Sequence, residues 1–100
     1  MNKEREIVES TQEELLDLWN GLYHKGSSDE LYGETYTHIE EIDTSKYSDG
    51  PSWDYILQRK SDGKYFKLHV WDGGYHNGFV IQREYLEEVF PEGENKVVYK

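Results

Sequence analysis

Cysteine is absent from the 100 residues of the sequence. This absence excludes disulfide bonds, thiolate metal sites, iron–sulfur clusters and a cysteine nucleophile. Long apolar runs are absent too, and no stretch approaches the roughly 18 consecutive apolar residues that a membrane span needs. The charged stretch 1–16 lacks the apolar segment of a signal peptide. We therefore expect a cytoplasmic protein that makes no contact with membranes.

Basic side chains are few. Eleven Lys and Arg face 21 Asp and Glu, which gives a formal net charge of −10 and a pI near 4.7. The imbalance lies in residues 1–50, which carry thirteen acidic and four basic side chains, whereas residues 51–100 carry eight and seven. Because binding to nucleic acid depends on Lys and Arg at the phosphates, we expect no direct binding. The same excess attracts basic protein surfaces, although solubility alone also accounts for an acidic composition.

Motifs for nucleotide binding and nucleophilic catalysis are missing as well. No Gly-rich phosphate loop leads from a strand into a helix, and no serine lies in a nucleophile elbow. We expect a protein that is not an enzyme and has no cofactor.

Aromatic residues are abundant, with fifteen in all and nine of them tyrosine. This content is too high for a disordered acidic tail and favours a folded, β-rich domain or a tyrosine-rich binding face. No linker or repeat divides the chain. We expect residues 1–100 to form one domain, with a mobile N-terminus over residues 1–9.

A helix is predicted from Thr11 to His24. Thr11 with Glu14, or the equivalent pair one residue earlier, can form a capping box. Apolar residues then recur at helical spacing, and Gly26 supplies a C-terminal stop. The apolar positions are Leu15, Leu18, Trp19 and Leu22.

The rest of the chain reads as strands and turns. Residues 27–33 are predicted to form a loop, residues 35–43 a strand and residues 48–52 a turn. Residues 53–71 form the best hairpin, in which a two-residue Asp62-Gly63 turn sets Leu57 opposite Leu68 and Tyr55 opposite Val70. The opposite face of this hairpin carries Ile56, Gln58, Tyr65, Lys67, His69 and Trp71.

A third strand is predicted over residues 79–83 and a last one over residues 96–100. Residues 83–90 fit either a short helix or an irregular strand, which Pro91 ends. The sum is an α+β fold, with one N-terminal amphipathic helix packed on an antiparallel meander sheet of four to five strands.

The segment 69–78 contains residue types that bind divalent metals, namely His69, Asp72 and His76. Their spacing matches no compact ligand motif, and His69 points away from the predicted core. We therefore expect no metal site and interpret the glycines of this segment as a wide turn. A small metal- or ligand-binding enzyme that uses these three residues remains an alternative.

Two sets of side chains are candidates for binding a partner. The first is the outer face of the hairpin, where aromatic residues of the kind enriched at interfaces could be exposed, unless another element covers this face. Its members are Tyr65, His69 and Trp71, with Tyr75 in the following loop. The second set consists of carboxylates that could imitate the phosphates of a nucleic acid, unless they are ordinary solvated charges. Its members are Glu13, Glu14, Asp17, Glu40, Glu41 and Asp43.

The pattern "WDYILQRKSDGKYFKLHV" with a terminal "VVYK" resembles small uncharacterised accessory proteins of bacteriophages. The resemblance covers the chain from Trp53 onward. It implies a phage protein that acts in the host cytoplasm by binding host machinery, as anti-defence inhibitors such as anti-CRISPR proteins do. It assigns no role to any residue.

These observations support three hypotheses. The first is a non-enzymatic, acidic inhibitor that mimics DNA and occupies the basic nucleic-acid-binding groove of a host defence nuclease. The second is an immunity or antitoxin-type partner of a basic toxin. The third is the small enzyme based on His69, Asp72 and His76.

Overall fold

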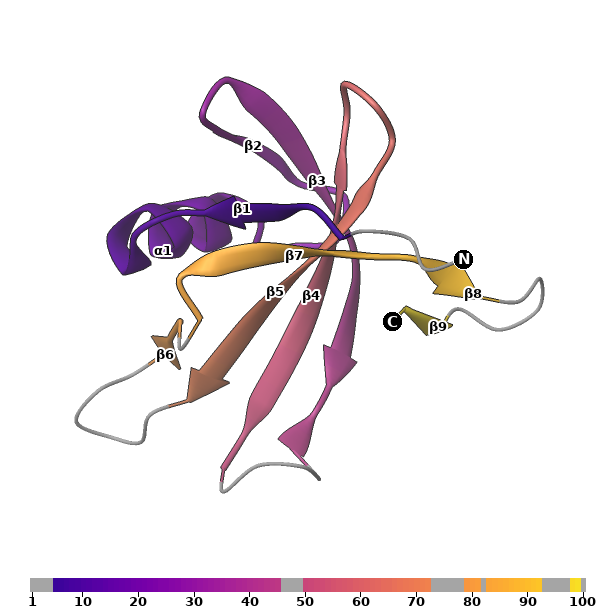
Figure 1. Ribbon diagram of the computed structural model, residues 1–100. Helices are drawn as coiled ribbons and strands as arrows, with labels where there is room; N and C mark the ends of the chain where they lie inside the picture. Colours follow the sequence, from indigo (N-terminus) through magenta and orange to yellow (C-terminus); the bar gives the residue numbers. More distant parts are fainter. Residues whose placement is uncertain (1–4, 46–49, 73–78, 82, 93–97, 100) are drawn as a thin grey trace.

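The computed structural model describes residues 5–45, 50–72, 79–81, 83–92 and 98–99. Within these ranges the chain forms one helix and nine strands (Figure 1). In chain order they are β1 (Ile7–Glu9), α1 (Gln12–Gly21), β2 (Ser28–Leu31), β3 (Glu34–Asp43), β4 (Ser52–Arg59), β5 (Tyr65–Asp72), β6 (Phe79–Val80), β7 (Tyr85–Val89), β8 (Pro91–Glu92) and β9 (Val98–Tyr99).

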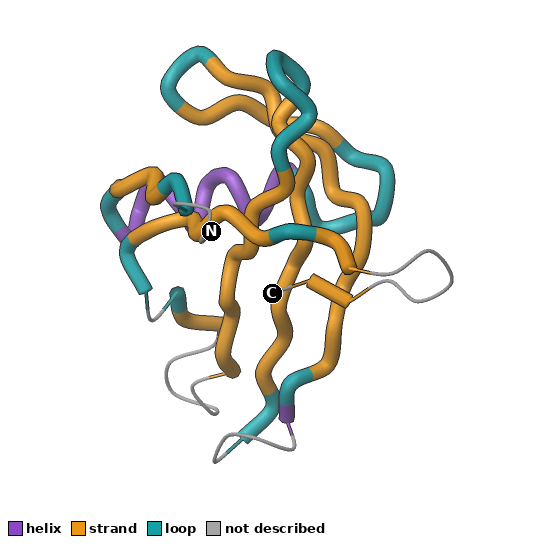
Figure 2. The backbone as a smooth tube through the Cα atoms, turned by 45° about the vertical axis from the view of Figure 1, so that its right-hand side comes forward, coloured by secondary structure: helices purple, strands orange, loops and turns teal. Residues whose placement is uncertain are grey.

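One antiparallel sheet contains most of the strands. Six of them lie in the order β1-β7-β5-β4-β3-β2, and β6 pairs with the end of β5. The pair β8–β9 forms a separate two-stranded sheet. Figure 1 shows β7 crossing the steep strands β4 and β5, so the sheet is strongly curled. Figure 2 shows the helix lying across the sheet.

The core lies between α1 and the concave face of the sheet. Its helical side consists of Leu15, Leu18, Trp19 and Leu22, all of them buried. Its remaining members, most of them on the strands, are Leu31, Tyr36, Tyr55, Leu57, Phe66, Leu68, Val70, Ile81 and Leu86. Burying each large apolar side chain contributes about 1.5–3 kcal/mol. A helix that packs on one face of an antiparallel sheet confirms the predicted α+β class.

The helix begins as predicted but ends earlier. Thr11 is the N-cap: its Oγ1 accepts from the backbone N–H of Glu14 at 3.1 Å, and its own N–H donates to Glu14 Oε1 at 3.2 Å. The last helical residue is Gly21, with Leu22 as the C-cap, rather than His24. Gly26 lies beyond the helix at φ +90°, where its N–H donates to the His38 carbonyl.

The prediction that the helix is the first element is wrong, because β1 precedes it. Ile7–Glu9 pairs with residues 85–87 of β7, so this part of the segment 1–9 belongs to the sheet. Residues 1–4 lie outside the described ranges. A three-residue strand is too short to show alternation in sequence, and only the edge of β7 provides its partner.

The segment 27–33, predicted as a loop, contains β2 instead. Ser28–Leu31 pairs with residues 34–37 of β3. The two-residue turn between them has positive φ at both positions, 54° at Tyr32 and 78° at Gly33. Such turns match the twist of a hairpin, but a Tyr-Gly pair lacks the Asn-Gly signal that would have predicted one. The sheet thus has more strands than the four to five expected.

The hairpin β4–β5 forms in a different register from the predicted one. Leu57 faces Phe66 and Tyr55 faces Leu68, a shift of two residues from the expected pairs. Because side chains alternate along a strand, a shift of two keeps the predicted faces. The turn is longer than the predicted Asp62-Gly63 pair. It is closed by the backbone N–H of Arg59, which donates to the Lys64 carbonyl at 2.8 Å.

The C-terminal strands differ in length from expectation. β6 has two residues rather than the predicted 79–83, although residue 82 is outside the described ranges. Residues 85–89 form strand β7, which selects the strand alternative over the short helix, and β7 ends before Pro91. The last predicted strand is present as β9, paired with β8.

The helix α1 has ten residues. In the part of the chain that the structure describes, no helix has the length and apolar character needed to cross a membrane.

Candidate partner-binding surface

An acidic groove lies between α1 and β2. Two of its carboxylates come from the helix and two from the strand that follows it. The groove encloses about 320 Å³ and is lined by Glu14, Asp17, Leu18, Asp29, Glu30, Leu31 and Tyr32. Glu14 and Asp17 are among the predicted partner-binding residues, whereas Asp29 and Glu30 are acidic residues outside that set. We call these seven residues the acidic groove.

Tyr32 fixes one wall of the acidic groove. Its side chain is 59% exposed, and its hydroxyl donates to Glu14 Oε1 at 2.9 Å. This hydrogen bond and that from the Thr11 backbone lower the pKa of the Glu14 carboxyl. Glu14 therefore keeps its negative charge while it is held in a fixed position.

Asp29 approaches the helix at Gly21. A Cβ atom on Gly21 would lie 1.9 Å from Asp29 Oδ2 and 2.8 Å from Asp29 Cβ. Asp29 Oδ1 also accepts from the Glu30 backbone N–H at 2.8 Å. The absent side chain at Gly21 thus allows this carboxylate to pack against α1.

The predicted cluster on residues 40–43 is divided between the two faces of the sheet. The pairing of β3 with β4 is irregular between His38 and Glu40. After this irregularity, Glu40 is opposite Ile56 and Glu41 is opposite Tyr55. Glu41 therefore shares the concave face with Tyr55, and so does Asp43, which is opposite Trp53. Glu40 lies on the other face and is half-buried. Among the helix acids, Glu13 is exposed and lies outside the acidic groove.

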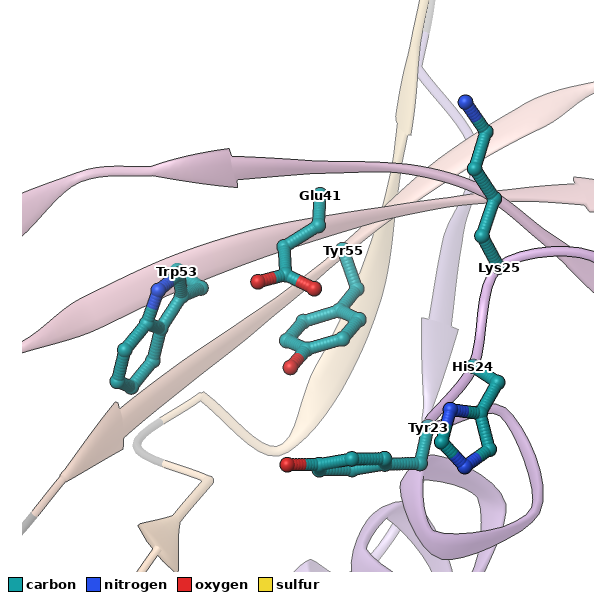
Figure 3. Close-up of a pocket in the computed structure, with 6 residues that line it drawn as sticks. All are labelled: Tyr23, His24, Lys25, Glu41, Trp53 and Tyr55. Carbon is teal, nitrogen blue, oxygen red and sulfur yellow. The ribbon is translucent and has the colours of Figure 1, made fainter.

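A second concavity, the aromatic pocket, lies where the chain leaves α1. It encloses about 310 Å³ and is lined by Tyr23, His24, Lys25, Glu41, Trp53 and Tyr55. Figure 3 shows the rings of Tyr23, Tyr55 and Trp53 around one space, with the Glu41 carboxylate beside Tyr55. The ammonium end of Lys25 points away from these rings in the same view.

Trp19 supports the aromatic pocket from inside the core. The centre of its ring lies 5.5 Å from the centre of the Tyr23 ring and 6.0 Å from that of the Tyr55 ring, and both pairs are T-shaped. Tyr55 is 4% exposed, whereas Tyr23 is 51% exposed. Burial raises the pKa of the Tyr55 hydroxyl, and the negative charge of Glu41 acts in the same direction. This pocket has no signal in the sequence, because its residues come from three separate segments.

The outer face of the hairpin is partly covered rather than freely exposed. Tyr65, His69 and Trp71 are half-buried there, and Ile56 of β4, on the same face, is fully buried. His69 Nδ1 lies 2.7 Å from Asp54 Oδ1 on the facing strand. The remaining member of this predicted set, Tyr75, lies outside the described residues.

Of the histidine and aspartate set considered as an alternative metal site, the structure describes only the His69 side chain. His69 already contacts Asp54, His76 and the Asp72 side chain are outside the described residues, and the glycine-rich turn lies there too. The described residues contain no cluster of three or more His, Cys, Asp or Glu that could hold a metal ion.

Several basic side chains of the second half are neutralised within the fold. Arg59 donates to Glu6 at 2.8 and 2.9 Å and to Asp62 at 2.6 and 3.1 Å. Lys64 lies 3.1 Å from Glu6, and a 3.5 Å ion pair joins Lys67 to Glu87. By contrast, no described residue forms a salt bridge with any of the four carboxylates in the acidic groove. The uneven charge of the sequence therefore persists on the folded surface.

The chain matches no protein-family model, no curated protein and no solved structure.

Proposed function

We propose that this protein is a non-enzymatic binding protein whose acidic surface docks on a basic surface of another protein. The observation that carries the proposal is the convergence of Glu14, Asp17, Asp29 and Glu30 on one groove. Packing carboxylates together is unfavourable because like charges repel. A basic partner would relieve that repulsion on binding and gain complementary contacts.

We infer the chemistry of the partner from this arrangement. A groove that normally holds nucleic acid presents rows of Lys and Arg to phosphates. Carboxylates fixed on a rigid helix and strand present negative charge to such a groove in a similar way. We propose a nuclease or another nucleic-acid-handling protein as the partner, blocked by steric and electrostatic occlusion. A phage inhibitor of host defence acts in this manner, and a protein that neutralises a basic toxin would use the same surface.

The experiment begins with tagged protein, used to capture partners from host cells at low and high salt. The captured protein is then purified, and its affinity for this chain is measured with and without competing duplex DNA. Since screening weakens contacts between exposed charges, we expect the affinity to fall at least about tenfold between about 0.05 and 0.3 M NaCl. DNA should compete for the same surface.

Two matched double variants locate the contact. Asp17→Lys with Glu30→Lys reverses two charges in the acidic groove, and we expect it to weaken association by about 10- to 100-fold. Glu9→Lys with Glu84→Lys makes the same change in net charge at exposed sites outside the groove, and should weaken association no more than about threefold. Equal losses in both variants, or binding that DNA does not reduce, would contradict the proposal.

A further inference from the structure

The aromatic pocket combines two features that bind cations. Three aromatic rings, those of Tyr23, Trp53 and Tyr55, surround one space, and the Glu41 carboxylate borders it (Figure 3). The faces of aromatic rings attract cations, and a nearby carboxylate adds a direct ionic contact. An anionic ligand would instead meet the negative charge of Glu41.

The surroundings reinforce this preference. Asp43 lies on the same face of β3 as Glu41, two residues further along. The pocket also lies just beyond the C-terminal end of α1, which carries the negative end of the helix dipole. Lys25 is the lining group of opposite sign, but its ammonium points away from the rings. The His24 ring forms a T-shaped contact with Tyr23, with ring centres 5.2 Å apart.

The pocket is also held in shape before any ligand binds. Trp19 is 6% exposed, and its ring forms T-shaped contacts with those of both Tyr23 and Tyr55. Tyr55 lies on the central strand β4, where register with β3 sets it opposite Glu41. Rings fixed by a core residue lose little conformational entropy on binding, which favours affinity.

We propose that the aromatic pocket is the anchor for an arginine side chain of the basic partner. The guanidinium group is planar, so it can stack on an aromatic ring and still donate two hydrogen bonds to a carboxylate. A lysine ammonium is a compact point charge and offers no flat surface for stacking. This inference rests on the proposed function, because the arginine belongs to the same basic partner.

The test uses a capped Gly-Arg-Gly peptide titrated into the isotope-labelled full chain, followed by NMR. We expect saturable shifts of the Trp53 indole N–H and the Tyr23 ring, with a millimolar dissociation constant. Gly-citrulline-Gly has the same shape without the charge and should bind about tenfold more weakly. Gly-Lys-Gly should bind about threefold to tenfold more weakly.

Variants of exposed residues keep the core intact. Glu41→Gln should weaken the arginine peptide about tenfold, and Tyr23→Leu by a similar factor. Glu84→Gln removes one charge at an exposed site outside the pocket, so it should leave the peptide affinity unchanged. Equal affinity for the citrulline peptide, tighter binding of a trimethyllysine peptide, or no effect of Glu41→Gln would overturn the assignment.

The two proposals fail separately. If partner binding depends on the acidic groove but the peptide shows no preference for arginine, the pocket assignment is wrong and the proposed function stands. If the peptide binds selectively but the captured protein is insensitive to charge reversal and to DNA, the proposed function is wrong.

Discussion

At the scale of single residues, Arg59 combines two ion pairs with a contact to an aromatic ring. It is 10% exposed at its side chain and pairs with both Glu6 and Asp62. Its guanidinium also lies 4.8 Å from the centre of the Phe66 ring. Because Glu6 immediately precedes β1, this cluster ties the first strand to the turn between β4 and β5.

The cluster makes stability sensitive to acid. Hydrogen bonds from Arg59, above all, lower the pKa of Glu6 from 4.5 to about 2 and that of Asp62 from 3.8 to about 2. A carboxyl whose pKa is lower in the folded state stabilises the fold above its unfolded pKa, and the contribution is lost as pH falls through the folded pKa. We therefore expect the loss to occur between about pH 4.5 and pH 2.

Glu6→Gln isolates this contribution. The Glu6 side chain is 36% exposed, so solvent screening reduces the expected cost to about 1 kcal/mol. Urea unfolding should show that difference near pH 7 and little of it near pH 2. Glu9→Gln, at the end of the adjoining strand β1 and exposed, is the matched control and should leave the pH profile unchanged. A difference that persists undiminished at pH 2 would show that the ion pair is not its source.

At the scale of elements, α1 and β2 are joined by a close contact that only glycine permits. The space for a Cβ on Gly21 is occupied by Asp29. This contact explains why the helix ends at Gly21, because glycine weakens a helix but allows the following strand to return alongside. The acidic groove depends on the same contact.

Gly21→Ala should therefore destabilise the protein by about 1–3 kcal/mol, the usual cost of overpacking. In an Asp29→Gly background the clash is removed, and the same substitution should instead stabilise by about 0.5–1 kcal/mol, as it does in an ordinary helix. Thermal unfolding of the four proteins in this cycle measures the coupling. Additive effects in the double variant would mean that Asp29 does not pack against Gly21.

At the scale of the whole molecule, charge is the dominant property. Arg59, Lys64 and Lys67 are held in ion pairs, while the net charge of the chain is −10. The fold therefore carries a strong excess of negative charge, and mutual repulsion of this kind lowers the stability of the compact state.

Added salt should raise stability despite the ion pairs. Screening reduces repulsion among exposed carboxylates over a Debye length of about 10 Å at 0.1 M. We expect the thermal midpoint to rise by about 4 °C or more between about 0.02 and 0.5 M NaCl, which corresponds to about 1 kcal/mol. Removing two acids, with Glu13→Gln and Glu30→Gln, should reduce the increment. A midpoint that falls with salt would indicate that the ion pairs outweigh the repulsion.

Local signals predicted the elements that carry strong patterns. The capping box at Thr11, the apolar face of α1 and the two faces of the central hairpin all follow from spacing within a few residues. The short strands β1 and β2 carry no such pattern. They form because distant edges, those of β7 and β3, complete their hydrogen bonds.

The candidate site was predictable only in part. Glu14, Asp17 and Glu41 carry the charge that composition and position already indicated, and each borders a concavity. Adjacent residues of a strand lie on opposite faces, but which of Glu40 and Glu41 lies on the concave face follows from the register of β3 on β4. Tyr23 and Tyr32 are exposed, whereas the hairpin residues Tyr65, His69 and Trp71 are half-buried, since exposure depends on what packs above a residue.

The α+β class, the helix start, the excess of negative charge and the absence of thiol chemistry can be predicted from the sequence, because they depend on composition and on neighbours along the chain. Which carboxylates share a groove, and which aromatic rings form a pocket, depends on the tertiary fold. Residues 41, 53 and 55 meet residues 23–25 because the curled sheet brings strands β3 and β4 to the end of α1. Such contacts link positions far apart in the chain, and pairing between strands, not local preference, determines them.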